Sequence, residues 1–250
     1  MPPVDPIGRV ALVTGAGKRL GRAIALDLAA AGCRVVVHYR SSEAEARDTA
    51  ATIAAAGGEA SVLQADLATP TGPGELVAAA CALYGRLDVV VGCAAVFRRT
   101  PWAEADLAAW QYHMDGNLTA AYLLARAAAD CLEDGGSIVT FGDWSGVRPY
   151  RDFLPYCVSK AGVIALTQAL AQELAPRIRV NCVCPGTVLP PDGAPDAKVA
   201  AIAAQTPLGR IGSPADIVAA VRFLTLGSDF TTGVILPVDG GRLIANGTLY

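Results

Sequence analysis

A stretch near the N-terminus decides the fold: VALVTGAGKRLG, residues 10–21. Arg9 to Val13 form a short apolar run that predicts a strand, and Leu20 to Ala31 carry apolar residues at helical spacing. The glycine-rich turn between them places free backbone N–H groups at the start of a helix, where a phosphate can bind. Gly15 and Gly21 allow the backbone to turn and to approach closely. Because tight turns need glycine anyway, this turn alone does not establish a nucleotide site.

Strand-like and helix-like segments continue to alternate towards the C-terminus. The further predicted strands are Cys33 to Val37, Ala60 to Leu63, Leu87 to Val91, Ser137 to Phe141, Ile178 to Val183 and Gly233 to Val238. The further predicted helices are Glu43 to Ala56, Gly74 to Tyr84, Asp106 to Leu132, Pro155 to Leu174, Ala197 to Ala204 and Ala215 to Leu226. Continuous apolar strands between helices must be buried on both faces. The pattern therefore predicts a single domain, residues 1–250, with a doubly wound α/β fold and a seven-stranded parallel sheet.

The composition argues against several classes of function. The chain has 250 residues, of which 53% are hydrophobic and 17% charged, so it can bury a large core. Its 20 basic and 23 acidic side chains give a net charge of −3 without a basic cluster, which argues against nucleic acid as a partner. No uncharged run approaches the ~18 residues of a membrane span, and the N-terminus resembles no export signal. We therefore expect a cytoplasmic protein with no membrane partner.

The cysteines and histidines do not predict a metal site. The seven cysteines are Cys33, Cys81, Cys93, Cys131, Cys157, Cys182 and Cys184, and none forms a Cys-x-x-Cys pair. The two histidines, His38 and His113, lie far apart in the sequence. We expect no metal, and we expect buried free thiols in a reducing compartment rather than a disulfide framework.

The residues after the second predicted strand favour NADP(H) over NAD(H). A carboxylate there usually accepts a hydrogen bond from the ribose 2′-hydroxyl of NAD. Here the sequence reads His38-Tyr39-Arg40-Ser41-Ser42, and the first acidic residue is Glu43. Arg40 and the serine hydroxyls suit a 2′-phosphate. The alternative is a solvated loop arginine, so the missing carboxylate is the stronger part of the argument.

Tyr156 and Lys160 are the candidate chemical groups. They lie four residues apart on a predicted apolar helix, so their side chains share one face. A neighbouring ammonium favours the phenolate and lowers the pKa of a tyrosine, which would let Tyr156 exchange a proton while a hydride moves. This spacing is also common on helix surfaces, so it is weak evidence by itself.

Several motifs together resemble the short-chain dehydrogenase/reductase family over essentially the whole chain. They are Thr14-Gly15 through Gly21, Asp66, Asn117, Tyr156 through Gly162, Asn181 through Gly186, and Val238 through Gly241. The resemblance implies a Rossmann fold and a homotetramer. It also implies that Asp66 contacts adenine, that Asn117 holds a water in a relay to Lys160, and that Lys160 bonds the nicotinamide ribose.

The predicted NADP(H) site combines this resemblance with the arguments above. Its residues are Gly15, Lys18, Arg19, Leu20, Gly21, His38, Tyr39, Arg40, Ser41, Asp66, Leu67, Ala94, Tyr156, Lys160, Pro185, Gly186 and Val188. The Pro- and Gly-rich segment 185–195 and the short helix after it are the candidate for a lid over the pocket, at about residues 187–212.

Departures from the family pattern point to a subfamily. Arg19 replaces a glycine of the turn, Gly92-Cys93-Ala94-Ala95 replaces Asn-Asn-Ala-Gly, and Asp143 stands thirteen residues before Tyr156, where a serine is expected. Together with Phe97, His38 to Ser41 and Pro185 to Pro191, these features resemble the pteridine reductases of bacterial type. That resemblance implies a pterin bound by Arg19, Phe97, Asp143 and Tyr156.

The predicted activity is NADPH-dependent reduction of a C=N bond in a dihydropterin. The catalytic residues would be Asp143, Tyr156, Lys160 and Asn117, with Tyr156 as proton donor. Phe97 would stack on the pterin, and Asp143 would relay a proton if burial raises its pKa. The alternative for Phe97 is a core or lid aromatic, and for Asp143 a turn or N-cap residue.

Two other functions remain open. A carbonyl or 3-oxoacyl thioester reductase would use Asp143 only as a polar contact. A protein that senses NADP without turnover is less consistent with the presence of Tyr156, Lys160 and Asn117 together. The roles of Trp144, Arg148 and Arg151 are left unassigned.

Overall fold

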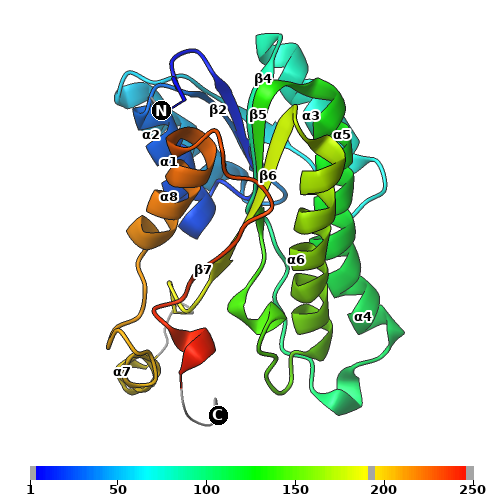
Figure 1. Cartoon of the computed structure of the whole chain (residues 1–250), viewed down its shortest axis with the longest axis vertical. Coiled ribbons are helices and arrows are strands. Elements are labelled where there is room, and N and C mark those ends of the chain that lie inside the picture. Colours follow the sequence, from blue (N-terminus) through cyan, green and yellow to red (C-terminus); the bar gives the residue numbers. More distant parts are fainter. Residues whose placement is uncertain (1–3, 191–194, 246–250) are drawn as a thin grey trace.

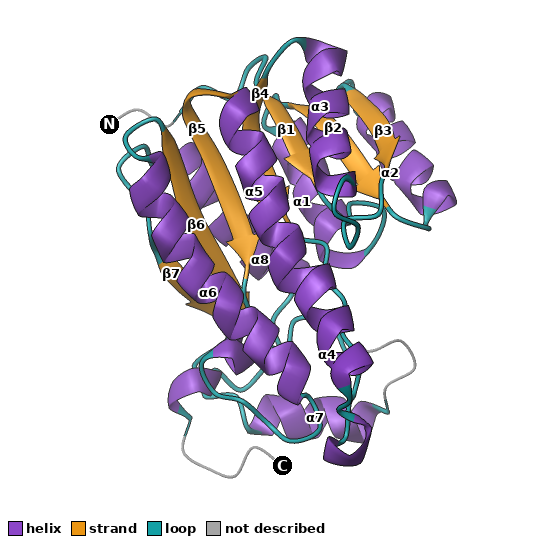
Figure 2. Ribbon diagram, turned by 90° about the vertical axis from the view of Figure 1, so that its right-hand side faces the viewer, coloured by secondary structure: helices purple, strands orange, loops and turns teal. Residues whose placement is uncertain are grey.

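A seven-stranded parallel sheet forms the centre of the molecule (Figures 1 and 2). The computed structural model describes residues 4–190 and 195–245. Its strands are β1 Val10–Val13, β2 Arg34–Tyr39, β3 Ala60–Gln64, β4 Leu87–Gly92, β5 Leu132–Phe141, β6 Ile178–Pro185 and β7 Ile235–Val238. They lie in the order β3-β2-β1-β4-β5-β6-β7, and every neighbouring pair is parallel. The predicted doubly wound α/β fold is confirmed.

Helices cover both faces of the sheet (Figure 1). They are α1 Arg19–Ala30, α2 Glu43–Ala55, α3 Gly72–Tyr84, α4 Leu107–His113, α5 Ala120–Cys131, α6 Leu154–Leu174, α7 Asp196–Ala204 and α8 Pro214–Arg222. Ala11 and Val13 belong to the core shared with α1, α2 and α8, whereas Val10 and Leu12 belong to the core shared with α3, α5 and α6. Because successive side chains of a strand point to opposite faces, burial of both faces explains the unbroken apolar run.

The strand order reverses at β1, which lies between β2 and β4. In open α/β sheets, ligands bind beyond the carboxyl ends of the strands at such a point. The glycine turn after β1 and the segment after β4 both begin there. The fold therefore creates a crevice between the residues predicted to bind the cofactor.

The long helix predicted from Asp106 to Leu132 is present but not uniform. α4 and α5 are joined without a break by a π-helical segment, Met114–Thr119, which contains Asn117. π-Helical turns are rare and are frequent at functional sites. The irregularity thus coincides with a residue predicted to be catalytic.

Cys81 on α3 and Cys131 on α5 are joined by a disulfide, so the expectation of free thiols is wrong for this pair. The two residues are 50 apart in sequence and meet only because α3 and α5 pack side by side. Cys33, Cys93, Cys157, Cys182 and Cys184 are free.

α6 is long and apolar enough to pass for a membrane-crossing helix by length and composition. It packs against β6 and carries the buried residues Tyr156 and Lys160. This helix places both side chains at the carboxyl edge of the sheet.

The described parts of the segment predicted as a lid, residues 187–190 and 195–212, contain α7 and lie beyond the carboxyl ends of the strands, at the bottom of Figure 1. Residues 191–194 of it lie outside the described residues. Its function as a lid stays a prediction.

Candidate active site

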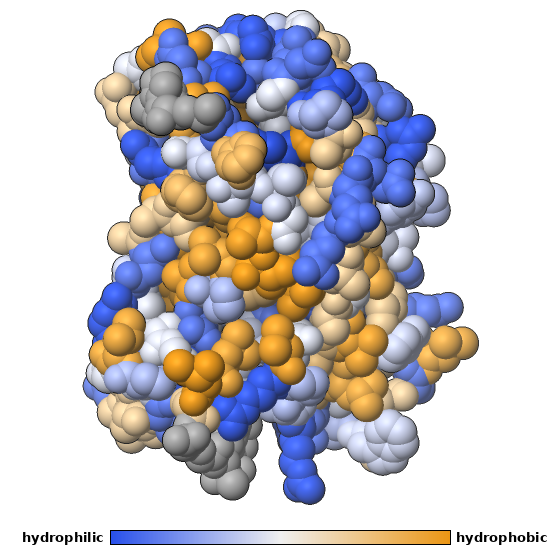
Figure 3. Space-filling model, in the orientation of Figure 1, coloured by the Kyte–Doolittle hydropathy of each residue, from blue (hydrophilic) through white to orange (hydrophobic). Residues whose placement is uncertain are grey.

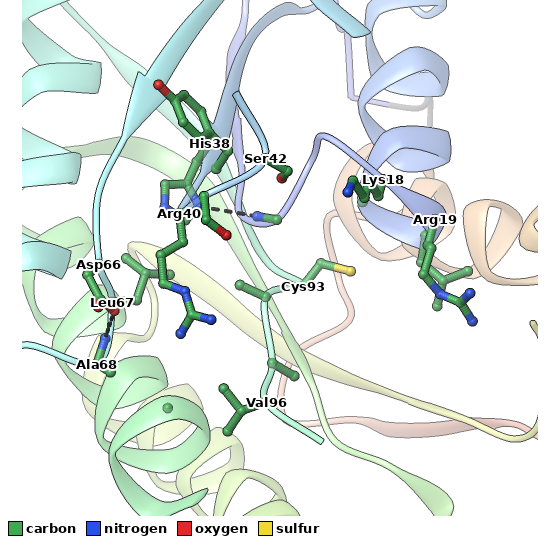
Figure 4. Close-up of a pocket in the computed structure, with 18 residues that line it drawn as sticks. Lys18, Arg19, His38, Arg40, Ser42, Asp66, Leu67, Ala68, Cys93 and Val96 are labelled. Carbon is green, nitrogen blue, oxygen red and sulfur yellow. Dashed lines mark hydrogen bonds between the residues drawn. The ribbon is translucent and has the colours of Figure 1, made fainter. Parts of the chain in front are cut away.

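A cavity of about 410 Å³ lies at the point where the strand order reverses (Figure 4). Most of the predicted cofactor residues line it: Gly15, Lys18, Arg19, Leu20, Gly21, His38, Tyr39, Arg40, Ser41, Asp66, Leu67 and Ala94. The cavity extends to Val96 and Gly116, which are close in sequence to Phe97 and Asn117. The predicted residues from four separate segments are thus brought together.

The glycine turn leaves no room for a side chain at position 21. A Cβ atom at position 21 would lie 2.3 Å from the carbonyl oxygen of Gly15, and Gly15 itself has a φ of +65°. The turn leads directly into α1, so the first N–H groups of that helix lie next to the cavity wall. Such a turn fits the pyrophosphate of a dinucleotide.

The imidazole of His38 is hydrogen-bonded to the backbone of this turn. Its Nδ1 accepts a hydrogen bond from the N–H of Gly15 at 3.2 Å (Figure 4). Its Nε2 lies 3.1 Å from the carbonyl oxygen of Ala65. Burial lowers the pKa of His38, so the neutral ring donates from Nε2 to Ala65. Both ring nitrogens of His38 are therefore bound to the backbone. Of the prediction that His38 binds the cofactor, the structure retains only that His38 lines the cavity.

Arg40 is placed as predicted, in an exposed position from which its side chain extends into the cavity (Figure 4). The nearest acidic residue in sequence, Glu43, accepts from Arg47 at 2.7 Å on the outer side of α2. Lys18 lines the cavity as predicted, but its Nζ also forms an ion pair with Glu45 at 2.6 Å. The cavity therefore has a cationic wall near Arg40.

The side chain of Arg19 is hydrogen-bonded to the segment that follows β6. Its Nη2 donates to the carbonyl oxygen of Leu189 at 2.8 Å and lies 3.4 Å from that of Pro190. Its φ of +50° lies in the left-handed region that glycine occupies most easily, consistent with a glycine at this place in the family pattern. The prediction that Arg19 contacts cofactor and substrate is thus modified, because the guanidinium connects the glycine turn to the segment after β6.

Tyr156 and Asp143 form a buried pair. The hydroxyl of Tyr156 donates to Oδ2 of Asp143 at 3.0 Å, and Oδ1 of Asp143 accepts from the N–H of Ser145 at 2.8 Å. Burial raises the pKa of Asp143, and burial together with the negative charge of Asp143 raises the pKa of Tyr156 well above its ordinary value. Asp143 is at once the N-cap of a short helical turn, Trp144–Gly146, and the partner of Tyr156.

Lys160 does not act on Tyr156 as predicted. Its Nζ donates to the carbonyl oxygen of Phe141 at 2.7 Å and lies 5.8 Å from the centroid of the Tyr156 ring. The predicted lowering of the Tyr156 pKa is not what results, because burial and then the charge of Asp143 raise it. Burial also lowers the pKa of Lys160 itself.

Asn117 connects the segment after β4 to α6. Its Oδ1 accepts from the N–H of Val96 at 2.8 Å, while its Nδ2 donates to the carbonyl oxygen of Val96 at 3.1 Å and to Oγ of Ser159 at 3.0 Å. A small cavity of about 20 Å³ is lined by Asn117, Lys160 and Ala94 among others. The role of Asn117 in a water relay stays a prediction.

Phe97 lies beside Tyr156. Its ring stacks on Phe153 with centroids 4.8 Å apart and meets the Tyr156 ring edge-on at 4.7 Å. Phe97 is nevertheless 58% exposed, so part of its surface is free to contact another molecule. The geometry excludes the alternative of a core aromatic for this residue.

The neighbourhood of Asp143 contains residues that the sequence did not identify. Trp144 stacks on Tyr150 at 5.4 Å, and the guanidinium of Arg242 lies 5.0 Å from the Trp144 ring. Arg148 donates to the carbonyl oxygens of Arg242 and Ala245. No local sequence signal predicts the contacts of Arg242 and Ala245, because both residues lie far from Asp143 in the sequence.

Pro185 is the last residue of β6, Gly186 and Val188 follow it, and none of the three is among the described residues that line the large cavity. A Cβ at position 186 would lie 2.7 Å from Cα of Asp239, so this segment packs tightly on the turn after β7. Their contact with a nicotinamide ring stays a prediction.

Comparison with known proteins agrees with this geometry. The family model described as enoyl-(acyl carrier protein) reductase matches residues 15–242. The chain is 36% identical over 253 residues to a 3beta-hydroxysteroid dehydrogenase of Eggerthella lenta, covering 97% of both proteins. It is 35% identical over 241 residues to a 3-oxoacyl-[acyl-carrier-protein] reductase of Synechocystis, covering 94% of this chain and 97% of the relative.

Solved structures show the same likeness. A short-chain dehydrogenase of Burkholderia cenocepacia, in complex with NADP, superposes with a TM-score of 0.89 at 34% identity and covers 95% of this chain and 99% of its own. A blue fluorescent protein from a metagenomic library, in complex with NADPH, has a TM-score of 0.89 at 31% identity with the same coverage. With the sheet order, the glycine turn and the placing of Tyr156 and Lys160, these matches show that the chain belongs to the short-chain dehydrogenase/reductase family.

Proposed function

We propose that this protein uses NADPH to reduce a C=N bond of a pterin, with Tyr156 as the proton donor. The observation that carries the proposal is the buried pair of Asp143 and Tyr156, whose oxygens lie 3.0 Å apart. A pterin ring nitrogen must gain a proton when the neighbouring carbon gains a hydride. A carboxyl group whose pKa is raised by burial can supply that proton, whereas a serine hydroxyl cannot.

NADP(H) is the proposed cofactor. The turn from Gly15 to Gly21 suits its pyrophosphate, and Arg40 with Ser41 suits its 2′-phosphate, while Glu43 is held by Arg47. Bound there, NADPH would supply the hydride. The complexes of the Burkholderia and metagenomic relatives with NADP and NADPH support this assignment.

The proton path follows from the pKa directions. When the Tyr156 hydroxyl turns to the substrate nitrogen and gives up its proton, Oδ2 of a neutral Asp143 donates to the phenol oxygen and replaces that proton, so no phenolate is left beside a neutral acid. The charge of the pair ends on the Asp143 carboxylate, where the N–H of Ser145 stabilises it. The cavity beside Asn117 and Lys160 is large enough for one water, which supports the predicted relay.

The substrate class is supported by Phe97. Its half-exposed ring lies edge-on to Tyr156, so a flat aromatic substrate would find both a stacking surface and a proton donor. The aliphatic chain of an oxoacyl thioester gains little from such a surface.

A carbonyl or 3-oxoacyl thioester reductase is the second candidate, favoured by the likeness to the Synechocystis 3-oxoacyl-[acyl-carrier-protein] reductase. NADPH depletion measured side by side with a dihydropterin, a folate and a 3-oxoacyl thioester separates the two. A higher kcat/KM for the pterin supports our proposal, and a higher value for the thioester replaces it. NADPH binding without turnover of any acceptor would identify the third possibility, a cofactor-sensing protein.

We also propose that the protein acts as a cytoplasmic homotetramer. Exposed apolar side chains on the helices around the site support assembly: Trp110, Tyr112, Tyr122, Leu154 and Val158. Apolar residues also gather near the edge strand β7, in the middle of the face shown in Figure 3. Light scattering of the purified protein measures the assembly, and a monomeric mass would exclude it.

A further inference from the structure

The peptide group between Phe141 and Gly142 is held from two sides. Its carbonyl oxygen accepts from Nζ of Lys160 at 2.7 Å, and its N–H donates to Sγ of Cys182 at 3.2 Å. Asp143 is the next residue in the chain. The position of the carboxyl group that contacts Tyr156 therefore depends on a peptide clamped between an ammonium and a sulfur.

The clamp is built into the sheet. Thr140 on β5 lies in register with Cys182 on β6. The residues that follow Thr140 are therefore next to the sulfur of Cys182. A Cβ at position 142 would lie 2.7 Å from Sγ of Cys184 and 3.0 Å from Sγ of Cys182. Glycine is thus required for the peptide to reach the two sulfurs.

The surroundings of Cys182 favour the thiolate. The two sulfurs lie 3.8 Å apart, and Cys182 is fully buried. A hydrogen bond from Cys184 lowers the pKa of Cys182 against the opposing effect of burial, and Thr140, the N–H of Gly142 and the charge of Lys160 lower it further. The pKa of Cys184 is raised in turn. A protonated Cys182 would donate to the carbonyl oxygen of Val183 at a long 3.6 Å or to Sγ of Cys184 at 3.8 Å.

The other titratable groups near this clamp come from three further elements. Lys160 reaches it from α6, Asp143 from the segment after β5, and Cys93 from the segment after β4. Burial raises the pKa of Cys93 to about 12, so this thiol stays neutral. Asp143 and Cys182 are therefore the anions that can balance Lys160.

We infer that Cys182 is a positioning residue of the active site: as a buried thiolate it holds the Phe141–Gly142 peptide opposite Lys160 and so places Asp143 against Tyr156. When Asp143 takes up a proton, the Cys182 thiolate is the negative charge that remains near Lys160. Its kinetic consequence rests on the proposed function, whereas its charge state does not.

The charge state is tested by titrating the ultraviolet absorbance of thiolate in the whole protein. The native protein should show a thiolate step below the ordinary thiol pKa of about 8.5. Cys182→Ser should lose this step, and Cys184→Ser should keep it because a serine hydroxyl still donates to Cys182. If the native protein has no step in this range, or if Cys182→Ser retains it, the inference is overturned.

The positioning role is tested by pterin reduction as a function of pH. Cys182→Ser and Cys182→Ala should lower kcat by about 10- to 150-fold, as expected for loss of one hydrogen bond to a charged group, and should shift the pH profile. The KM for NADPH should not change, because Cys182 does not line the cofactor cavity. Cys33→Ser, which also places a hydroxyl in a core, is the matched control and should leave kcat and the profile unchanged.

Unchanged kcat and pH profile in the Cys182→Ala variant would overturn the positioning role. If the native protein reduces no pterin, the proposed function fails, and the absorbance titration still decides the charge state of Cys182. Thermal unfolding of each variant shows whether it is folded, and a folded Cys182→Ala with native kinetics is sufficient to refute the role.

Discussion

Replacing Asp143 by asparagine tests the proton path most directly. The substitution keeps the size of the side chain and an acceptor for the N–H of Ser145, but removes the charge and the acidic proton. Hydrogen bonds to charged groups contribute about 1.5–3 kcal/mol, which corresponds to about a 10- to 150-fold change in rate. We expect kcat for the pterin to fall within this range, with NADPH affinity nearly unchanged because Asp143 does not line the cofactor cavity.

The raised pKa of Asp143 fixes the direction in which the reaction rate changes with pH. Burial raises the pKa of Asp143, and the productive form carries the proton, so the native rate should fall as pH rises through this raised pKa. The Asp143→Asn variant has no such group, and its profile should lack this decline. The difference between the two proteins should therefore be largest at low pH and should shrink as pH rises.

The assay is the initial rate of NADPH depletion with a dihydropterin, over roughly pH 5 to 9 so that both protonation states are sampled. Thermal unfolding at neutral pH is the control: asparagine keeps the size of the side chain and the acceptor for the N–H of Ser145, so the variant should be folded. Parallel pH profiles for the native protein and the variant would refute the relay.

Three further substitutions test the remaining parts of the site. Tyr156→Phe should lower turnover by about 100- to 10,000-fold with NADPH affinity within a few-fold, and equal loss of both, measured by kinetics and fluorescence titration, would contradict a proton donor. Arg40→Ala should weaken NADPH binding by about 10-fold or more and leave NADH binding nearly unchanged, while Arg47→Ala, on the outer side of α2, should affect neither cofactor. Gly21→Ala places a Cβ 2.3 Å from the oxygen of Gly15, so calorimetry should detect no NADPH binding at concentrations that saturate the native protein.

The sheet and the helices were predictable because their signals are local. Strands buried on both faces are apolar throughout, as in Val10–Val13, and the helices between them keep their own spacing. The glycine turn was recognisable for the same reason, since Gly21 is dictated by a backbone contact only six residues away. The pairing of Asp143 with Tyr156 followed from a family spacing and was confirmed at 3.0 Å.

Contacts between distant segments were not predictable. Arg19 reaches Leu189, Phe97 stacks on Phe153, and Cys81 is bonded to Cys131, although nothing in the local sequence of either partner signals the other. The direction of the Tyr156 pKa also depends on such a contact. The spacing to Lys160 indicated a lowered pKa, but the pKa is raised, first because Tyr156 is buried and then because the charge of Asp143 lies beside its hydroxyl.

The amino-acid pattern was therefore enough to assign the fold class, the glycine turn and the residue types available for chemistry, because each is a property of a short segment. Which groups touch one another, and hence which of them are charged, was set by the packing of the elements. Electrostatic effects depend on distance and burial, and both arise only when β5, β6 and α6 come together around Asp143, Lys160 and Cys182.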